Sequence, residues 1–243
     1  MDNKLSFKEL IQLNIDRYGY HVTIVGGGVH PRFAYSIGLY SILKFEMIFA
    51  GGAIYLKDEL LQIFNTVVSE LKVNNNALSQ KISINGLGEF TFSLVHHSWS
   101  RMMLLGTFDY YKDINDIQVY QIIPGYQHFT YDIPDMSKQW DESTEPVWQW
   151  LKRKWNYNVP ENSTVVTNID ALQGEPITEL MRWELDEWEM FAGSGPDVEK
   201  KDMRVVSLGT MLGIDNTLLP AIDLEVGKGL WRTDKESEWE KWG

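Results

Sequence analysis

The chain of 243 residues contains no cysteine. This absence excludes disulfide bonds, thiolate metal sites and cysteine nucleophiles. No apolar stretch approaches the roughly 18 to 20 residues that a membrane-spanning helix needs, and the N-terminus opens an amphipathic segment instead of a signal peptide. We therefore expect a cytoplasmic protein with no membrane partner. At about 150 residues per domain, the length predicts one or two domains.

Positive charge is also scarce, with 22 Lys and Arg against 34 Asp and Glu and a net charge of −12. Residues 1–160 carry 14 basic and 16 acidic side chains, a net of −2, whereas residues 161–243 carry 8 and 18, a net of −10. Such a field repels phosphate backbones, so we expect no nucleic-acid partner, and it attracts a basic protein. The alternative is an acidic surface that serves only solubility.

Residues 1–135 mix helical and extended patterns without a regular strand–helix–strand alternation, which predicts an α+β domain. A capping box formed by Ser6 and Glu9 predicts the first helix, over 6–18. Short β-branched or apolar runs predict the strands, and a 3.6-residue apolar period predicts the other helices. These expected elements are helices over 57–73 and 98–111 and strands over 21–25, 33–37, 46–50, 81–84, 90–95 and 117–123.

The character of the sequence changes over 136–160, where four tryptophans surround Glu145 and Pro146. Because proline suits the first turn of a helix, we expect a bridging helix from Pro146 to about Trp155, followed by a linker. Residues 161–243 then form an acidic, mainly β domain. Its expected elements are strands over 164–169, 230–232 and 239–242, a hairpin over 181–190 that turns at residues 186 and 187, and a short helix over 207–212.

Glycine-rich segments carry no cofactor motif. Gly26–Gly28 follows an expected strand, but Pro31 disfavours the helix that a dinucleotide-binding fingerprint needs, so we interpret the segment as a flexible turn. Gly193-Ser194-Gly195 lacks the spacing of a nucleophile elbow and is also interpreted as a turn. No cluster has metal-ligand spacing, and we expect neither a metal nor another cofactor.

The histidines suggest one pocket in the N-terminal domain. His21, Tyr35 and one of His96 and His97 could meet there as acid and base groups. The adjacent His96 and His97 are expected at a strand end, with side chains on opposite faces. The alternative, which we prefer, is a hydrogen-bonded core histidine beside a tyrosine that packs through its ring.

Tryptophan is concentrated towards the C-terminus, with nine of the ten after residue 139. In the expected hairpin, Met181, Trp183 and Leu185 share one face, and the carboxylates on the other face are free to meet a partner. Aromatic anchors surrounded by carboxylates are typical of protein-binding surfaces, although tryptophans also build the cores of small β domains. The candidate partner-binding residues are Trp183, Glu184, Asp186, Glu187, Trp188 and Glu189.

Two resemblances cover most of the chain. The segments 19–22, Pro31 to Leu39, 46–51, Tyr110-Tyr111 and 119–124 resemble the family known as domain of unknown function 4262. That family implies a domain boundary but no activity. The segments 182–186, 188–195, 205–210, 215–219 and 226–232 resemble domain of unknown function 2185, also called immunity protein family 33. At Gly193-Ser194-Gly195 the sequence departs from the usual pattern of this second family.

The second resemblance implies an immunity protein, which binds and neutralises a toxin that competing bacteria deliver. An acidic domain suits a basic toxin, and a cytoplasmic protein would meet a toxin with a cytoplasmic target. The leading hypothesis is therefore a non-enzymatic, stoichiometric inhibitor. The alternative is an enzyme of unknown reaction, in which the N-terminal domain uses His21 and Tyr35 to reverse toxin damage or to act on a small molecule.

Overall fold

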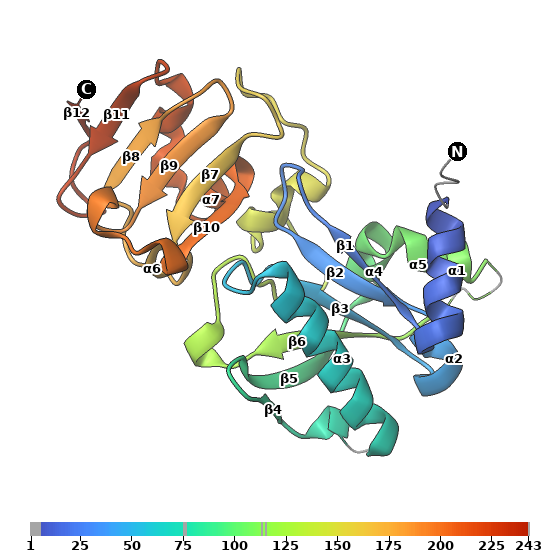
Figure 1. Ribbon diagram of the computed structural model, residues 1–243. Helices are drawn as coiled ribbons and strands as arrows, with labels where there is room; N and C mark the ends of the chain where they lie inside the picture. Colours follow the sequence, from blue (N-terminus) through green and yellow to red (C-terminus); the bar gives the residue numbers. More distant parts are fainter. Residues whose placement is uncertain (1–5, 75–76, 113, 115, 243) are drawn as a thin grey trace, which may run out of the picture.

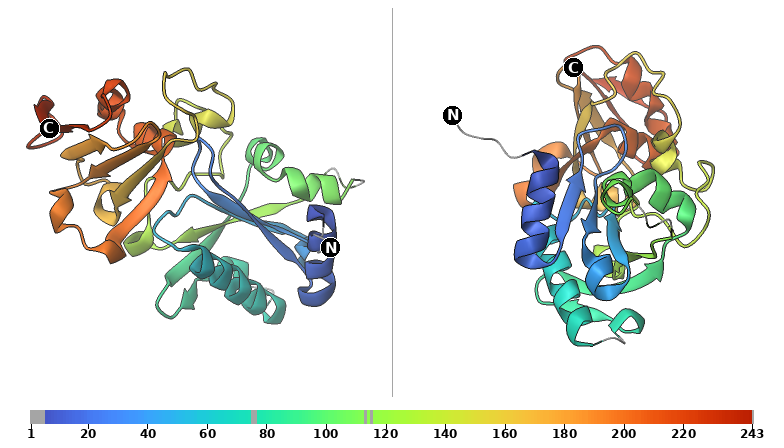
Figure 2. Two further views of the ribbon diagram at one scale, coloured as in Figure 1. Left: turned by 45° about the horizontal axis from the view of Figure 1, so that its top comes forward. Right: turned by 90° about the vertical axis from the view of Figure 1, so that its right-hand side faces the viewer.

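A computed structural model describes residues 6–74, 77–112, 114 and 116–242. Two six-stranded sheets lie side by side, one in each lobe (Figures 1 and 2), and this confirms the predicted α+β fold. The N-terminal lobe holds the first sheet and most of the helices, whereas the C-terminal lobe consists mostly of strands. In the described part of the chain, no helix is long and apolar enough to cross a membrane.

The N-terminal sheet has the strand order β1-β2-β3-β6-β5-β4, in which only β3 and β6 pair in parallel. Its strands are β1 (His21–Val25), β2 (Phe33–Ile37), β3 (Glu46–Ala50), β4 (Ile82–Ile84), β5 (Gly88–Leu94) and β6 (Val119–Pro124). The helices of this lobe are α1 (Phe7–Tyr18), α2 (Leu39–Leu43), α3 (Lys57–Val73), α4 (His97–Met103) and α5 (Leu105–Tyr110), with 3₁₀ turns η1 (Ala77–Ser79) and η2 (Tyr126–His128).

Both faces of this sheet are covered. Phe64 of α3 belongs to the apolar cluster on one face, and Trp99 of α4 belongs to the cluster on the other face. All five residues of β2 and of β3 are buried. Strands buried on both faces are apolar almost without interruption, which explains why β2 and β3 lack the polar alternation of a surface strand.

The C-terminal sheet has the order β10-β7-β9-β8-β11-β12, in which only β7 and β9 pair in parallel. Its strands are β7 (Thr164–Asn168), β8 (Glu179–Arg182), β9 (Glu187–Phe191), β10 (Met203–Ser207), β11 (Lys228–Trp231) and β12 (Glu240–Trp242). The remaining elements of this lobe are α6 (Ile169–Leu172), α7 (Leu208–Ile214), η4 (Gly195–Asp197), η5 (Lys200–Asp202) and η6 (Asn216–Asp223). Its apolar cluster lies between α7, η6 and one face of the sheet.

The bridging segment differs from the prediction. In place of an α-helix to Trp155, the structure has a six-residue 3₁₀ helix, η3 (Pro146–Leu151). The indole of Trp148 donates to the carbonyl of Asp132, and the indole of Trp150 donates to the carbonyl of Gly209 in the other lobe. We attribute the shorter helix to this packing, because the two tryptophans are buried against different lobes.

The expected helix over 98–111 is two helices, α4 and α5, separated at Leu104. The break brings Gly106 onto the N-terminal sheet, where its backbone N–H donates to the hydroxyl of Tyr35 (3.2 Å). A Cβ at Gly106 would lie 2.8 Å from that hydroxyl, so the close approach requires glycine. Tertiary packing therefore overrides the local helical pattern.

The hairpin over 181–190 turns earlier than predicted. Strand β8 ends at Arg182, and Trp183 to Asp186 form the turn, closed by the N–H of Trp183 donating to the carbonyl of Glu187 (3.0 Å). Leu185 therefore lies in the turn and not on the strand face assigned to it. The α2, α6 and β10 elements are additions that the sequence did not predict.

The two lobes contact each other directly. Ser207 of β10 donates its hydroxyl to the carbonyl of Val29 in the β1–β2 loop (2.7 Å), and Arg204 donates to the carbonyl of Ile54 (2.8 Å). On α7, a Cβ at Gly209 would lie 2.3 Å from the Val29 carbonyl oxygen. The lobes are thus joined through backbone groups as well as through the bridging segment.

Candidate functional site

One face of the C-terminal sheet is open to solvent. Leu180, Trp188 and Met190 point into the apolar cluster, so the residues that alternate with them along β8 and β9 point to the opposite face. We call this opposite side the open face, and Figure 1 shows its strands in front of α7. Its exposed and half-buried residues include Glu179, Met181, Trp183, Glu187, Glu189, Val205, Trp231 and Trp242, with Val166 and Met203 between them. Phe191 lies on the same side but is buried beside Gly195.

The strand register places one row of residues across the whole open face. It runs from Val205 on β10 through Val166, Glu189, Met181 and Gly229 to Trp242 on β12. A Cβ at Gly229 would lie 2.5 Å from the ring of Trp242, so the indole lies directly on the backbone of β11. A hollow of about 380 Å³ opens between Met181, Trp183 and Trp242.

The open face combines exposed aromatics with free carboxylates. Trp183 is 48% exposed, Trp231 39% and Trp242 36%. Glu187 is exposed and Glu189 half-buried, and neither forms a salt bridge with any residue that the structure describes. A partner that covers this surface would bury apolar area and could place positive charges opposite the carboxylates.

The structure places the six candidate partner-binding residues in different settings. Trp183 and Glu187 lie at the edge of the open face, Glu189 lies within it, and Glu184 and Asp186 lie in the turn. Trp188 is only 1% exposed, and its indole donates to the carbonyl of Ala221 (3.1 Å). Trp188 is therefore a core residue that cannot contact a partner, because the strand alternation directs it to the face beneath α7 and η6.

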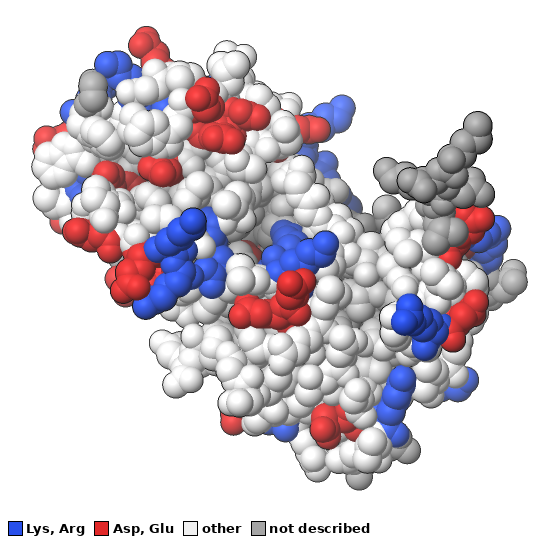
Figure 3. Space-filling model, in the orientation of Figure 1, with Lys and Arg blue, Asp and Glu red and all other residues white. Residues whose placement is uncertain are grey.

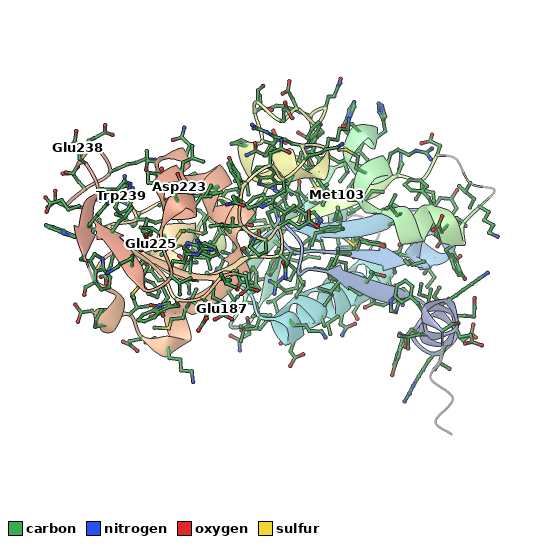
Figure 4. The ribbon with its side chains drawn as sticks, turned by 90° about the horizontal axis from the view of Figure 1, so that it is seen from above. Met103, Glu187, Asp223, Glu225, Glu238 and Trp239 are labelled. Atoms are coloured by element: carbon green, nitrogen blue, oxygen red, sulfur yellow. The ribbon has the colours of Figure 1, made fainter. Side chains whose placement is uncertain are left out.

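Acidic residues are spread over the rest of the C-terminal lobe. Figure 3 shows red side chains scattered over its visible surface, and Figure 4 places Glu187, Asp223, Glu225 and Glu238 in this lobe, away from Met103 of the other lobe. All four carboxylates are exposed. The negative field predicted from the sequence thus belongs to the lobe that carries the open face.

The residues of the predicted N-terminal pocket do not meet. His21 and Tyr35 lie on the same face of neighbouring strands, where Thr23 is the register partner of Tyr35. His96 and His97 follow β5, and three strands lie between β5 and β1. At about 4.8 Å per strand, β5 lies roughly 19 Å from β1, which carries His21, and roughly 14 Å from β2, which carries Tyr35.

Each of these residues has a local role instead. The amide of Asn14 donates to Nδ1 of His21 (2.8 Å), and burial lowers the pKa of this histidine. Burial also raises the pKa of Tyr35, whose hydroxyl holds Gly106. Nδ1 of His96 accepts the N–H of Ser98 and caps α4. The rings of His96 and His97 are 4.1 Å apart, not on opposite faces, because His96 precedes a helix and does not lie in a strand.

Glu46 is a buried carboxylate that was not predicted from the sequence. Glu46 on β3 is fully buried, and its Oε1 accepts the N–H of Gly38 (2.9 Å), the N–H of Tyr40 (3.0 Å) and the hydroxyl of Tyr111 (2.8 Å). Its Oε2 accepts the hydroxyl of Ser36. Burial outweighs these hydrogen bonds and raises the pKa of Glu46. A charged residue that opens a strand otherwise made of apolar residues was the signal, because such a group needs partners.

The Glu46 network explains a motif that the sequence analysis singled out. Gly38 has a φ of 111°, and a Cβ there would lie 3.1 Å from the carbonyl oxygen of Gly19. The segment from Ser36 to Tyr40 therefore wraps around the carboxylate of Glu46 and starts α2. We interpret this arrangement as structural, because every oxygen of the carboxylate is already hydrogen-bonded.

No group of three or more His, Asp or Glu side chains that could hold a metal ion occurs among the described residues. Residues 14–128 match a family model described as Domain of unknown function (DUF4262). The match covers the N-terminal sheet and ends before the bridging segment. No curated protein and no solved structure matches the chain significantly.

Proposed function

We propose that the protein is an immunity protein, which binds and neutralises a bacterial antagonistic toxin in the cytoplasm by forming a stoichiometric complex. The observation that supports this proposal is the open face of the C-terminal sheet. It presents Trp183, Trp231 and Trp242 beside the carboxylates of Glu187 and Glu189. The toxin surface that fits this face is basic and carries apolar side chains.

The aromatic residues would supply most of the affinity. Tryptophan is enriched among the residues that dominate binding energies, because its large ring buries much apolar area with few rotatable bonds. Six strands at about 4.8 Å and three to five residues per strand give the open face roughly 24 by 15 Å. This is roughly half of the 800 Å² that one partner of a standard interface buries. The turn at Trp183 to Asp186 extends the surface at one end.

The carboxylates would act mainly on the association rate. Opposite charges on two partners steer their encounter, and rim charges change the association rate more than the lifetime of the complex. The net charge of −10 over residues 161–243 adds a long-range contribution that salt screens. Binding to a basic toxin should therefore weaken as the salt concentration rises.

The experiment begins with growth rescue. The protein is co-expressed with a panel of bacterial toxins that act on cytoplasmic targets. Each toxin against which the protein restores growth is then titrated with the purified protein. A stable complex with one toxin per protein supports the proposal. Protection at far below equimolar amounts contradicts it and supports the alternative, an N-terminal enzyme that uses His21 and Tyr35.

Matched variants then locate the surface. Trp183→Ala and Glu187→Lys should weaken the complex, whereas Glu70→Lys on the exposed side of α3 should not, because it makes the same charge change on the other lobe. His21→Phe and Tyr35→Phe should leave protection intact. If both variants bind the toxin and fold but no longer protect, inhibition by binding is wrong.

A further inference from the structure

A second feature lies where the two lobes meet. A cavity of about 230 Å³ is lined by the β1–β2 loop, Ala53 and Asp132 on one side, and by β7, β10 and α7 on the other. Figure 3 shows a hollow between the lobes with Lys and Arg side chains on both of its sides. The residues that line the cavity and carry polar side chains are His30, Arg32, Asp132, Asn162, Thr164, Ser207 and Thr210.

Several of these groups have hydrogen-bonding capacity to spare. Nη2 of Arg32 donates to the carbonyls of Tyr55 (2.6 Å) and Gly52 (3.3 Å), but its Nε is buried without a partner among the residues described. Nδ1 of His30 donates to the carbonyl of Pro31, which leaves Nε2 as an acceptor in the neutral ring.

The β7 side of the cavity adds one more free group, the hydroxyl of Thr164. It forms no hydrogen bond within the described part of the chain, whereas the hydroxyls of Ser207 and Thr210 bond to each other (2.7 Å). Unpartnered polar groups from both lobes thus converge on one cavity. Of these groups, the Nε of Arg32 is buried, and because a buried donor without a partner is costly, a ligand that accepts its N–H would gain binding energy.

The unpaired N–H of the Arg32 guanidinium favours an anion. Arg204 adds positive charge near Arg32, and the carboxylates of Asp132 and Glu59 offset it. Both carboxylates already accept hydrogen bonds from other groups of the protein. Asp132 accepts the hydroxyl of Thr130 and the N–H of Ala53, and Glu59 accepts the N–H of Leu56. Asp132 and Arg32 form no salt bridge within 4.0 Å in the described structure, which leaves the guanidinium available.

Two glycines leave space in the cavity. Gly26 and Gly28 have no positive φ, so their backbone does not require glycine. A Cβ at Gly26 would lie 3.6 Å from Cγ of Arg32, and one at Gly28 would lie 3.8 Å from Nε2 of His30, both ordinary contacts. Alanine therefore fits at either position, and its methyl group would occupy room beside the two groups that could hold a ligand.

We infer that this cavity between the lobes binds a small phosphate-bearing ligand. A guanidinium and a hydroxyl donate to phosphate oxygens. A phosphate group offers three acceptor oxygens to donors that reach the cavity from both lobes, one more than a carboxylate. The ligand contacts both lobes, and it would therefore stabilise their arrangement.

The test uses the full chain and inorganic phosphate as the probe. Binding is measured by calorimetric titration and by the melting temperature, with acetate at equal ionic strength as the comparison. We expect saturable phosphate binding and a higher melting temperature, with a much smaller effect of acetate. No saturable binding up to about 10 mM phosphate, or equal effects of phosphate and acetate, would overturn the inference.

Three variants assign the binding to the cavity. Arg32→Gln should weaken phosphate binding at least tenfold and Thr164→Val about threefold to tenfold, in line with lost charged and neutral hydrogen bonds. Gly28→Ala should weaken it with little change in the melting temperature of the free protein. Thr91→Val, at an exposed position on β5, is the matched control.

Arg32 also supports the loop before α3, so its variant could lose stability. Thr164→Val and Gly28→Ala avoid this problem, because neither removes a hydrogen bond within the described structure. Unchanged phosphate affinity in both of these variants would place the anion elsewhere on the protein and refute the cavity as its site.

Discussion

The two sheets of this protein have six strands each, but they differ in how many faces are covered. The N-terminal sheet has apolar clusters on both faces, whereas the C-terminal sheet has one cluster and an open face. The acidic side chains of the two sheets differ in the same way. In the N-terminal sheet the carboxylate of Glu46 is enclosed by four donors, whereas in the C-terminal sheet Glu187 and Glu189 face solvent.

The number of covered faces decides where each sheet can bind a partner. A sheet covered on both faces has only its edges, loops and ends left for a partner, whereas an open face also offers the exposed side chains of its strands. Tryptophan shows the same contrast inside one lobe, because Trp188 fills the core and Trp183, five residues earlier, stays exposed.

The largest effect is expected from the two faces of the β8–β9 hairpin. Trp188→Ala should lower the free energy of unfolding by about 3 to 5 kcal/mol, because it leaves a cavity beneath the sheet. Trp183→Ala should lower it by less than about 1 kcal/mol, since its ring is 48% exposed. Urea unfolding followed by circular dichroism measures both. Similar losses for the two variants would show that the open face is covered in solution.

The next largest effect on stability is expected from replacing one carboxylate in each sheet. Glu46→Gln should cost about 1 to 3 kcal/mol, because the amide nitrogen would face donors in a buried site. Glu189→Gln should stay within about 0.5 kcal/mol. The same unfolding experiment compares them at pH 4, where the contribution of Glu46 is present, and a Glu46→Gln variant as stable as wild type at that pH would contradict the buried network.

The two lobes should also respond differently to pH. In the C-terminal lobe, burial opposes ionisation of Asp215, but hydrogen bonds from Thr217 and the charges of Lys235 and Arg232 outweigh it and lower its pKa. Its contribution to stability is therefore present above its ordinary value of 3.8 and is lost as the pH falls through the lowered value. The raised pKa of Glu46 gives the opposite sign, a contribution present below 4.5 and lost as the pH rises through the raised value.

Unfolding between pH 3 and pH 7 separates these two contributions. The stability difference between wild type and Asp215→Asn should shrink as the pH falls towards 3. The difference between wild type and Glu46→Gln should shrink as the pH rises above 4.5. Differences that do not change with pH in either pair would show that the carboxyl group concerned titrates alike in the folded and unfolded protein.

The smallest effect on stability is expected at the turn of the hairpin. Reversing Glu184 and Glu187 to Lys together should change the free energy of unfolding by about 0.5 kcal/mol or less, because both are exposed. The same variant should slow association with a basic toxin and reduce the dependence of binding on salt. Stopped-flow mixing at several salt concentrations measures this. Unchanged rates would assign the acidic charge to solubility.

The elements that the sequence predicted well are those with strong local signals. The capping box of Ser6 and Glu9 starts α1 as expected, and Gly19 ends it with a φ of 86°. The strands β1, β2 and β3 and the helix α3 have the predicted bounds, because β-branched runs and a clear helical period determine them locally. The glycine turn at Gly26–Gly28 also lies between two paired strands.

The elements that the sequence did not predict depend on distant contacts. The helix break at Leu104 follows from the contact of Gly106 with Tyr35, 71 residues away. The 3₁₀ bridge follows from indole hydrogen bonds of Trp148 and Trp150 to different lobes. In the candidate site, the exposure of Trp183 was predictable from its place near a turn, whereas the burial of Trp188 depends on η6, whose carbonyl at Ala221 it meets.

By itself, the sequence determined the α+β class, the concentration of acidic charge in the last third and the presence of aromatic residues among these charges. These properties follow from composition and local periodicity, which need no partner elsewhere in the chain. The tertiary structure alone decided that one sheet keeps an open face, that four histidine and tyrosine side chains do not form one pocket, and that a polar cavity lies between the lobes. These properties depend on which strands pair and which helices cover them, and pairing brings together residues that no short segment contains.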